Sequence, residues 1–166
     1  NSLNYHSPIV IDKKVTIKAA LFIDKEQKGK TSKKIIYFSK AIGKNVQYNT
    51  KYSDRYSGSG PLTLVNGLTG TIAHNDNYWQ GWKGQNIDVT IDLDDIKNIS
   101  KVSVGFLESH GSWIFLPTHV IVSFSTDGLS FGSESEIRIN DGENGGPANR
   151  IDCESIDLNL SARYVK

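Results

Sequence analysis

The sequence predicts an all-β domain, either a sandwich or a barrel, from three observations. Short runs of alternating apolar and polar residues recur along the chain, turn-forming residues separate them, and no stretch has the periodicity of a long amphipathic helix. Many short strands divided by turns are typical of sandwiches and barrels. The chain has 166 residues, of which 37% are apolar, so it is long enough to bury one core.

The first predicted element is a β-hairpin close to the N-terminus. Residues 15–23 alternate apolar and polar side chains, which predicts a strand with one apolar face. A second strand is expected over residues 34–42, after a polar turn over residues 24–32. Because a lone hairpin with one apolar face is marginal in water, either an upstream part of its own domain or the following domain must cover that face.

The pattern changes at Gly43, after which a series of strands is expected. The alternating runs that predict strands cover residues 86–93, 101–107, 118–126, 135–140 and 163–166. The dipeptide Asp127-Gly128 favours a hairpin turn, and Asp94-Asp95 is expected to form another turn. A loop is predicted over residues 140–150, and residues 62–67 are expected to form a short helical or irregular piece. Trp79 stands at the start of a strand-like run and is expected in the core.

Charge and cysteine content exclude several classes of function. The net charge is +1, so nothing indicates a nucleic acid as the partner. Residues 1–51 carry eleven lysines against three acidic residues, an excess that favours a solvated face over a binding patch. Cys153 is the only cysteine, which rules out an internal disulfide. No apolar run reaches the roughly 18 residues of a membrane helix, and both ends of the sequence are expected to lie inside a longer protein.

The residues that carry chemistry form no recognisable catalytic set. No serine lies in a nucleophile elbow, no glycine-rich phosphate loop precedes a helix, and the single cysteine has no partner pattern. The four histidines lack the spacing of a zinc site. We therefore expect this stretch of chain not to be an enzyme.

Three loop clusters have the chemistry of a sugar-binding site. A sugar ring offers an apolar C–H face on which an aromatic side chain stacks, and a rim of hydroxyls that hydrogen-bond to polar side chains. Loops at one end of a rigid sandwich normally display such groups. The candidate carbohydrate-binding residues are Tyr52, Arg55, Tyr56, His74, Asn75, His110 and Trp113.

Each candidate also has a structural alternative. Arg55 can instead form an ion pair with Asp54 or Asp76. His110, beside a glycine, can be a solvated loop residue. Alternation in residues 113–116 puts Trp113 on the face opposite Ile114 and Leu116, so only one of the two faces is buried.

Longer stretches of the sequence resemble a known family. They are "YNTKYSDRYSGSGPLTLVNGLTGT", "YWQGW", "DVTIDLDDIKNISKVSVGFLESHGSWIFLPTHVIVSFSTDGLSF" and "ARYVK". Together they resemble the discoidin, or coagulation factor 5/8 type C, domain, in the version attached to bacterial family 20 β-N-acetylhexosaminidases of Bacteroides-like organisms. The resemblance covers residues 43–166, and residues 1–42 look like the tail of a fibronectin-III-like domain.

This resemblance implies a fold and a function. The fold is a jelly-roll β-sandwich, galactose-binding-domain-like, with an extra N-terminal β-hairpin and a truncated C-terminal strand. The function is that of a non-catalytic, family 32-like carbohydrate-binding module in a secreted, periplasmic or cell-surface glycoside hydrolase. Its partners are glycans of the galactose or N-acetylhexosamine type and the catalytic domain of the same parent chain. The alternative is a spacer domain that packs on the catalytic domain without binding sugar.

The resemblance also implies a structural calcium ion near Asn66. The family usually has an aspartate at this position, and a neutral amide is a weaker calcium ligand than a carboxylate. The acidic residue that the family carries on its closing strand would follow Lys166, which is the last residue of the sequence. Calcium is therefore expected to bind weakly here, and the missing strand is expected to leave a sheet edge unpaired.

Overall fold

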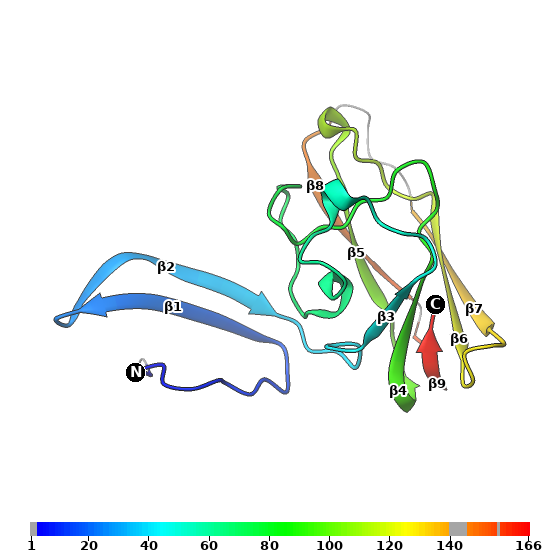
Figure 1. Ribbon diagram of the computed structural model, residues 1–166, viewed down its shortest axis with the longest axis horizontal. Coiled ribbons are helices and arrows are strands. Elements are labelled where there is room, and N and C mark those ends of the chain that lie inside the picture. Colours follow the sequence, from blue (N-terminus) through cyan, green and yellow to red (C-terminus); the bar gives the residue numbers. More distant parts are fainter. Residues whose placement is uncertain (1–2, 140–145, 156) are drawn as a thin grey trace.

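The computed structural model describes residues 3–139, 146–155 and 157–166. In these segments the chain forms nine strands and three 3-10 helices of three residues each (Figure 1). The strands form one five-stranded and two two-stranded sheets, all antiparallel. The prediction of an all-β domain with an N-terminal hairpin is confirmed.

The N-terminal hairpin consists of β1 (Val15–Ile23) and β2 (Glu26–Ile36). Its turn is the pair Asp24-Lys25, whose φ angles of 52° and 67° give the twist that suits a two-residue hairpin. The prediction of a long polar turn followed by a strand over residues 34–42 was therefore wrong. The polar run belongs to β2 because both faces of this strand are largely exposed, so apolar alternation is not required of it.

The hairpin projects from the rest of the molecule, to the left in Figure 1. At its tip Leu21, Phe22 and Ile23 are 61%, 53% and 51% exposed, so the apolar face that was expected to need cover lies in solvent in this chain. Its base is joined to the sandwich by a backbone hydrogen bond of 3.1 Å, in which the Tyr37 N–H donates to the Gly67 carbonyl.

The five-stranded sheet forms the larger layer of a sandwich. Its strand order is β3-β4-β9-β6-β7. The strands are β3 (Asn45–Tyr48), β4 (Val89–Ile99), β9 (Leu160–Val165), β6 (His119–Ser125) and β7 (Gly132–Arg138). The last stretch of the sequence thus forms a strand, as predicted, and this strand lies in the middle of the sheet between β4 and β6.

The smaller layer is the pair β5 (Ser103–Glu108) and β8 (Asn149–Glu154). Strand β5 was predicted, but β8 was not, and the loop expected over residues 140–150 overlaps its first two residues. Residues 140–145 of that expected loop lie outside the described part of the chain. β8 escaped prediction because its apolar residues, Ile151 and Cys153, number only two.

The core lies between the layers and confirms the predicted alternation. Leu93, Val122, Phe124 and Ala162 are between 1% and 5% exposed and form one cluster with Ile99. Burying each large side chain of this kind stabilises the fold by about 1.5–3 kcal/mol. The predicted short piece near residue 64 is the 3-10 helix η2 (Thr63–Val65), whose Val65 is 2% exposed.

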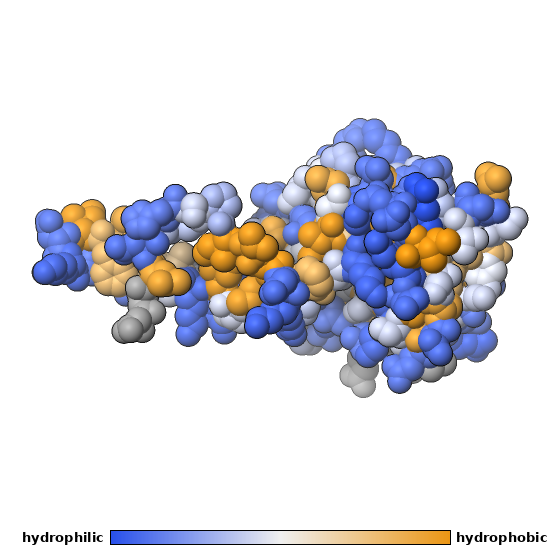
Figure 2. All heavy atoms as spheres, turned by 90° about the horizontal axis from the view of Figure 1, so that it is seen from below, coloured by the Kyte–Doolittle hydropathy of each residue, from blue (hydrophilic) through white to orange (hydrophobic). Residues whose placement is uncertain are grey.

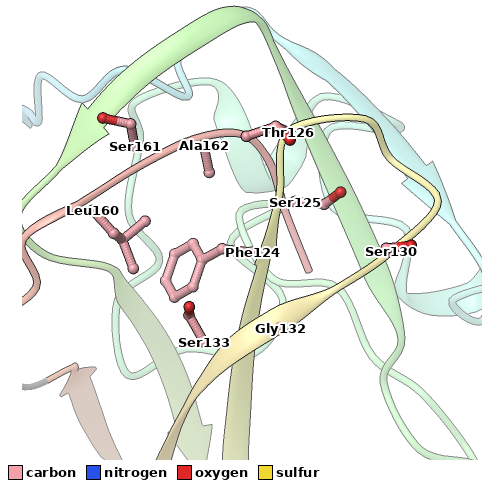
Figure 3. A pocket seen from close by; sticks show the side chains of 9 residues that line it. All are labelled: Phe124, Ser125, Thr126, Ser130, Gly132, Ser133, Leu160, Ser161 and Ala162. Carbon is pink, nitrogen blue, oxygen red and sulfur yellow. The ribbon is translucent and has the colours of Figure 1, made fainter.

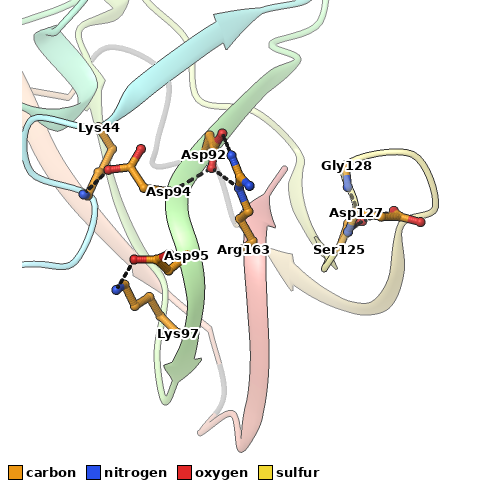
Figure 4. A network of polar contacts seen from close by, with 9 residues as sticks. All are labelled: Lys44, Asp92, Asp94, Asp95, Lys97, Ser125, Asp127, Gly128 and Arg163. Atoms are coloured by element: carbon orange, nitrogen blue, oxygen red, sulfur yellow. Dashed lines mark hydrogen bonds and ion pairs between the residues drawn. The ribbon is translucent and has the colours of Figure 1, made fainter.

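Asp94 and Asp95 do not form the predicted turn. Both lie inside β4, where the register with β9 shifts between Asp92 and Lys97, and Asp94 has a φ of 69°. This bulge interrupts the alternation, which made the strand look as though it ended. Beside it the Arg163 guanidinium makes two 2.8 Å hydrogen bonds to Asp92 (Figure 4), and these hold the pKa of the Asp92 carboxyl below its ordinary value.

Candidate functional site

A cavity of about 280 Å³ lies between two loops, residues 55–58 and residues 74–79. We call it the loop cavity. The first loop contains most of helix η1 (Asp54–Tyr56), which lies toward the same end of the sandwich as helix η3 (His110–Ser112) in Figure 1. The residues that line the loop cavity are Arg55, Tyr56, Ser57, Gly58, His74, Asn75, Asn77 and Trp79.

The lining includes four of the seven candidates, namely Arg55, Tyr56, His74 and Asn75. These residues come from two clusters that are about twenty positions apart in the sequence. Their side chains offer a guanidinium, a phenol, an imidazole and an amide, which are groups that hydrogen-bond to hydroxyls or stack on a ring.

The first loop is held by the segment that follows the second loop. The Ser53 N–H donates to the Gly81 carbonyl at 2.8 Å, and the Gly81 N–H donates to the Tyr56 carbonyl at 3.0 Å. A Cβ at Gly81 would lie 3.1 Å from the Tyr56 Cβ, so a glycine permits this close approach. The sequence "YWQGW" therefore fixes the position of helix η1.

The second loop is organised by Asp76. One of its carboxylate oxygens accepts a hydrogen bond from the Thr71 N–H at 2.6 Å, and the other accepts one from the Tyr78 N–H at 2.9 Å. The Ser59 hydroxyl donates to the Asn77 carbonyl at 2.9 Å and ties the two loops together. Asp76 thus acts in folding the loop, and no ion pair joins it to Arg55 in the part of the chain that the structure describes.

Trp79 forms one wall of the cavity and is half-buried, where sequence analysis expected a core residue. Its indole N–H donates to the Thr71 carbonyl at 2.9 Å. Gly70 lies against the ring so closely that a Cβ there would overlap the indole. The guanidinium carbon of Arg150 lies 5.9 Å from the ring centroid, and this guanidinium donates to the Gly70 carbonyl at 3.1 Å. The indole is therefore held rigidly in place.

Arg55 and Tyr56 are exposed and lie against each other in the first loop. Tyr56 is 43% exposed, and the guanidinium carbon of Arg55 lies 5.6 Å from the centroid of its ring. The neighbouring Asp54 pairs with Lys51 at 2.8 Å and raises the pKa of the Lys51 ammonium. Within the described residues Arg55 makes no ion pair, so its donors are available to a ligand.

Tyr52 is placed in an aromatic cluster instead of the cavity. Its ring lies 4.8 Å from that of Tyr48 and 6.2 Å from that of Trp82, both edge-on. The Trp82 indole N–H donates to the Thr50 carbonyl at 2.9 Å. This cluster supports the base of the first loop from beneath.

The third group of candidates lies in residues 109–115, which we call the Trp113 tip. Trp113 is 85% exposed with a φ of 58°, and Phe115 is 58% exposed. The side chain of His110 is 11% exposed, and its Nε2 lies 3.1 Å from Oε1 of Glu108, whose side chain is 9% exposed. His110 is therefore neither a solvated residue nor a surface hydrogen-bonding group. No residue of the tip is among those that line the loop cavity.

Sequence reasoning did not select Ser57, Gly58, Asn77 and Trp79 as part of the site. Ser57, Gly58 and Asn77 each lie within two residues of a selected candidate, and Trp79 lies four residues after Asn75, so their position in the sequence was the signal that could have found them. Gly58 has a φ of 58°, and a Cβ there would lie 2.8 Å from the Thr63 side chain. The loop conformation requires a glycine at this position. The sequence alone does not reveal that requirement.

A second cavity of about 220 Å³ lies where β9 separates from β6 and β7, in the five-stranded sheet (Figure 3). Its wall combines the apolar side chains of Phe124, Leu160 and Ala162 with serine and threonine hydroxyls. Phe124 is only 5% exposed, so its ring is not available for stacking. None of its lining residues is charged, so the loop cavity has the richer binding chemistry.

Asn66, the residue expected near a calcium ion, has its side chain in a local turn. Its side-chain oxygen accepts a hydrogen bond from the Leu68 N–H at 2.8 Å, as in a turn closed by an asparagine. No group of three or more histidine, cysteine, aspartate or glutamate side chains that could hold a metal ion occurs in that part of the chain. Asn66 offers calcium a neutral amide oxygen that already accepts this hydrogen bond, and such an oxygen is a weaker ligand than a carboxylate.

Comparisons with known protein families and with curated proteins find no match to this chain. Within the described residues, no helix is both long and apolar enough to cross a membrane. Cys153 is buried, and burial raises the pKa of its thiol, so the chain's one cysteine is not an activated nucleophile.

Proposed function

We propose that the loop cavity binds a saccharide and that this domain is a non-catalytic carbohydrate-binding module. The observation that carries the proposal is the lining itself: a fixed indole wall, an exposed tyrosine, and guanidinium, imidazole and amide groups around one hollow. Small-ligand sites combine apolar surface with a few placed polar groups in this way.

The size of the cavity supports recognition of one or two sugar units. Its volume of about 280 Å³ lies just below the usual range for drug-sized ligands, which begins at about 300 Å³. The rigid support from Gly81, Asp76 and the wall residue Trp79 reduces the entropy that binding must overcome. A weak module of this kind raises the local concentration of substrate for an attached enzyme.

The resemblance of residues 43–166 to discoidin domains extends the proposal to the parent protein. The module then belongs to a secreted, periplasmic or cell-surface glycoside hydrolase, a β-N-acetylhexosaminidase, whose catalytic domain lies outside this sequence. Its ligands are glycans of the galactose or N-acetylhexosamine type. The same resemblance makes calcium a candidate structural ion, and a thermal unfolding series with calcium and with a chelator tests it. An unchanged Tm would exclude the ion.

The test of saccharide binding is calorimetric titration of galactose, N-acetylglucosamine and their oligomers into the protein. Arg55→Ala and Tyr56→Ala are each expected to weaken binding by about tenfold or more, because each removes a hydrogen-bonding or stacking group. Trp113→Ala, which removes an equally aromatic residue outside the cavity, should change the Kd by less than about twofold. If none of the sugars binds the unmodified protein, the proposal is lost.

A second candidate function, that of a structural spacer, is favoured by the N-terminal hairpin. The exposed apolar tip formed by Leu21, Phe22 and Ile23 is typical of a surface that packs against another domain. This role concerns the first forty residues and leaves the loop cavity without an explanation. Absence of glycan binding by the unmodified protein, together with a loss of contact to the neighbouring domain when Leu21, Phe22 and Ile23 are replaced by serine, would favour the spacer.

A further inference from the structure

The loop cavity carries a positive charge without a negative one in its wall. Arg55 is in the lining, and none of the lining residues is an aspartate or glutamate. The two nearest carboxylates in the sequence are already engaged, Asp54 by Lys51 and Asp76 by two backbone N–H groups. A neutral sugar would leave this guanidinium to be satisfied by hydroxyls alone, whereas a carboxylate matches its planar pair of donors.

The N-terminal hairpin supplies further positive charge beside the same loops. Residues 15–36 contain six lysines and two acidic residues, an excess of four positive charges. Of these lysines, Lys28 pairs with Glu26 at 2.7 Å, whereas Lys30 and Lys33 make no ion pair within the described residues. Hydrophilic and apolar residues alternate over the hairpin, and a larger apolar cluster lies nearer the sandwich (Figure 2).

The hairpin is connected to the wall of the cavity. At the end of β2, the Lys34 ammonium lies 3.5 Å from the centroid of the Tyr78 ring. Tyr78 stands between Asn77 and Trp79, which both line the cavity. A ligand that leaves the cavity on this side therefore meets a strand rich in lysine.

From these two observations we infer that the saccharide is an acidic polysaccharide whose uronate carboxylate lies on Arg55. The neighbouring sugar units extend over β2. There the lysine ammonium groups attract the carboxylates of these units at a longer range. This inference rests on the proposed saccharide-binding function and names its ligand class. Carboxylate is preferred to sulfate because the planar guanidinium pairs with a planar carboxylate through two parallel hydrogen bonds.

The experiment compares three probes by titration calorimetry: hyaluronan oligosaccharides, the same oligosaccharides with each carboxylate reduced to an alcohol, and neutral chitooligosaccharides of equal length. We expect the intact acidic chain to bind about tenfold or more tightly than its reduced form, as for a charge-assisted hydrogen bond. Binding of the acidic chain should also weaken between about 0.1 M and 1 M salt, over which the screening length falls from about 10 Å to about 3 Å.

Variants that remove single positive charges show which residues cause the preference for the acidic chain. Arg55→Gln should weaken binding of the acidic chain far more than binding of the reduced chain, so that the two chains bind this variant with similar affinity. The double variant Lys30→Gln with Lys33→Gln should weaken binding of long acidic chains and not of a single disaccharide. Lys97→Gln removes the same charge from β4, away from the hairpin, and is the matched control that should change neither affinity.

The outcomes distinguish failure of the acidic-ligand inference from failure of the proposed saccharide binding. If the neutral and acidic chains bind equally, the acidic inference is overturned and saccharide binding stands. If no chain binds, both the acidic-ligand inference and the proposed saccharide binding are wrong. If dextran sulfate binds and hyaluronan does not, the carboxylate assignment is wrong. If duplex DNA binds as tightly as hyaluronan, the surface recognises charge alone and the inference is also lost.

Discussion

The two loop regions with the most promising composition have opposite shapes. The loop cavity and the Trp113 tip both carry a histidine and exposed aromatic residues. In the cavity, His74 and Tyr56 from two separate loops line one hollow. In the tip, Trp113 is 85% exposed on a convex turn, while His110 is buried against Glu108.

The difference shows that a site needs loops that meet, and not only suitable residues. The cavity arises because the segment around Gly81 hydrogen-bonds to both ends of helix η1, and because the hydroxyl of Ser59 holds the second loop. The tip is a single turn closed on itself, in which the Ile114 N–H donates to the Ser109 carbonyl at 3.1 Å. Four predictions test this contrast.

The largest effect is expected from Gly70→Ala, since the new methyl group overlaps the Trp79 ring and must displace the cavity wall. Overpacking of this kind destabilises a protein by about 1–3 kcal/mol, and saccharide binding should be lost with it. Gly111→Ala is the control in the tip, because a Cβ there has no heavy atom within 4 Å. Thermal unfolding and titration of both variants measure the contrast, and equal effects would contradict it.

The next effect concerns stability alone. His110→Ala removes the imidazole that lies 3.1 Å from the carboxylate of the buried Glu108, which is expected to cost about 1–3 kcal/mol of unfolding free energy. Glycan affinity should be unchanged, because His110 is not in the cavity lining. His119→Ala, at the exposed start of β6, is the matched control and should be nearly neutral. A loss of affinity in His110→Ala would move the site to the tip.

A smaller effect is expected from the backbone of Trp113. Its φ of 58° is unfavourable for any residue with a Cβ, by about 1–2 kcal/mol. Trp113→Gly should therefore be more stable than Trp113→Ala by about 1 kcal/mol, since the two variants lose the same indole contacts. Denaturant unfolding of the pair measures the difference. Equal midpoints would show that the tip relaxes to another conformation.

The smallest effect is expected on stability at low pH and comes from the turn between β6 and β7. This turn lies outside both loop regions and therefore serves as a reference for them. Hydrogen bonds from the N–H groups of Ser130 and Leu129 lower the pKa of Asp127 to about 2, from an ordinary value of 3.8. A lowered pKa contributes stability that is present above about pH 4 and is lost as the pH falls toward 2. Asp127→Asn should flatten this acid limb without changing affinity, as followed by unfolding at several pH values. An unchanged limb would exclude Asp127 as its source.

Much of the sandwich could be predicted from the sequence, because alternation reports which side chains face the core. The alternating runs over residues 86–93 and 118–126 accordingly contain the buried side chains of Leu93, Val122 and Phe124. The bulge at Asp94 and the two-residue turn of the hairpin were missed, since both depend on positive φ angles that no apolar pattern reveals.

The candidate site was predictable only in part. Residue chemistry selected Arg55, Tyr56, His74 and Asn75, which the structure brings to one cavity. It also selected His110, whose side chain is only 11% exposed and lies against Glu108, because a histidine beside a glycine has the same sequence signature in a solvated loop and in a packed one. Which loops meet is decided by long-range hydrogen bonds, and these have no local pattern.

The most direct test is to map a bound glycan by the NMR signals of the protein during a titration. The account predicts that signals of Arg55, His74 and the Trp79 indole shift together with one saturation curve. The Trp113 indole should stay unshifted in the same titration. Shifts confined to Trp113 and Phe115, or no shift in any loop, would contradict a saccharide site in the loop cavity.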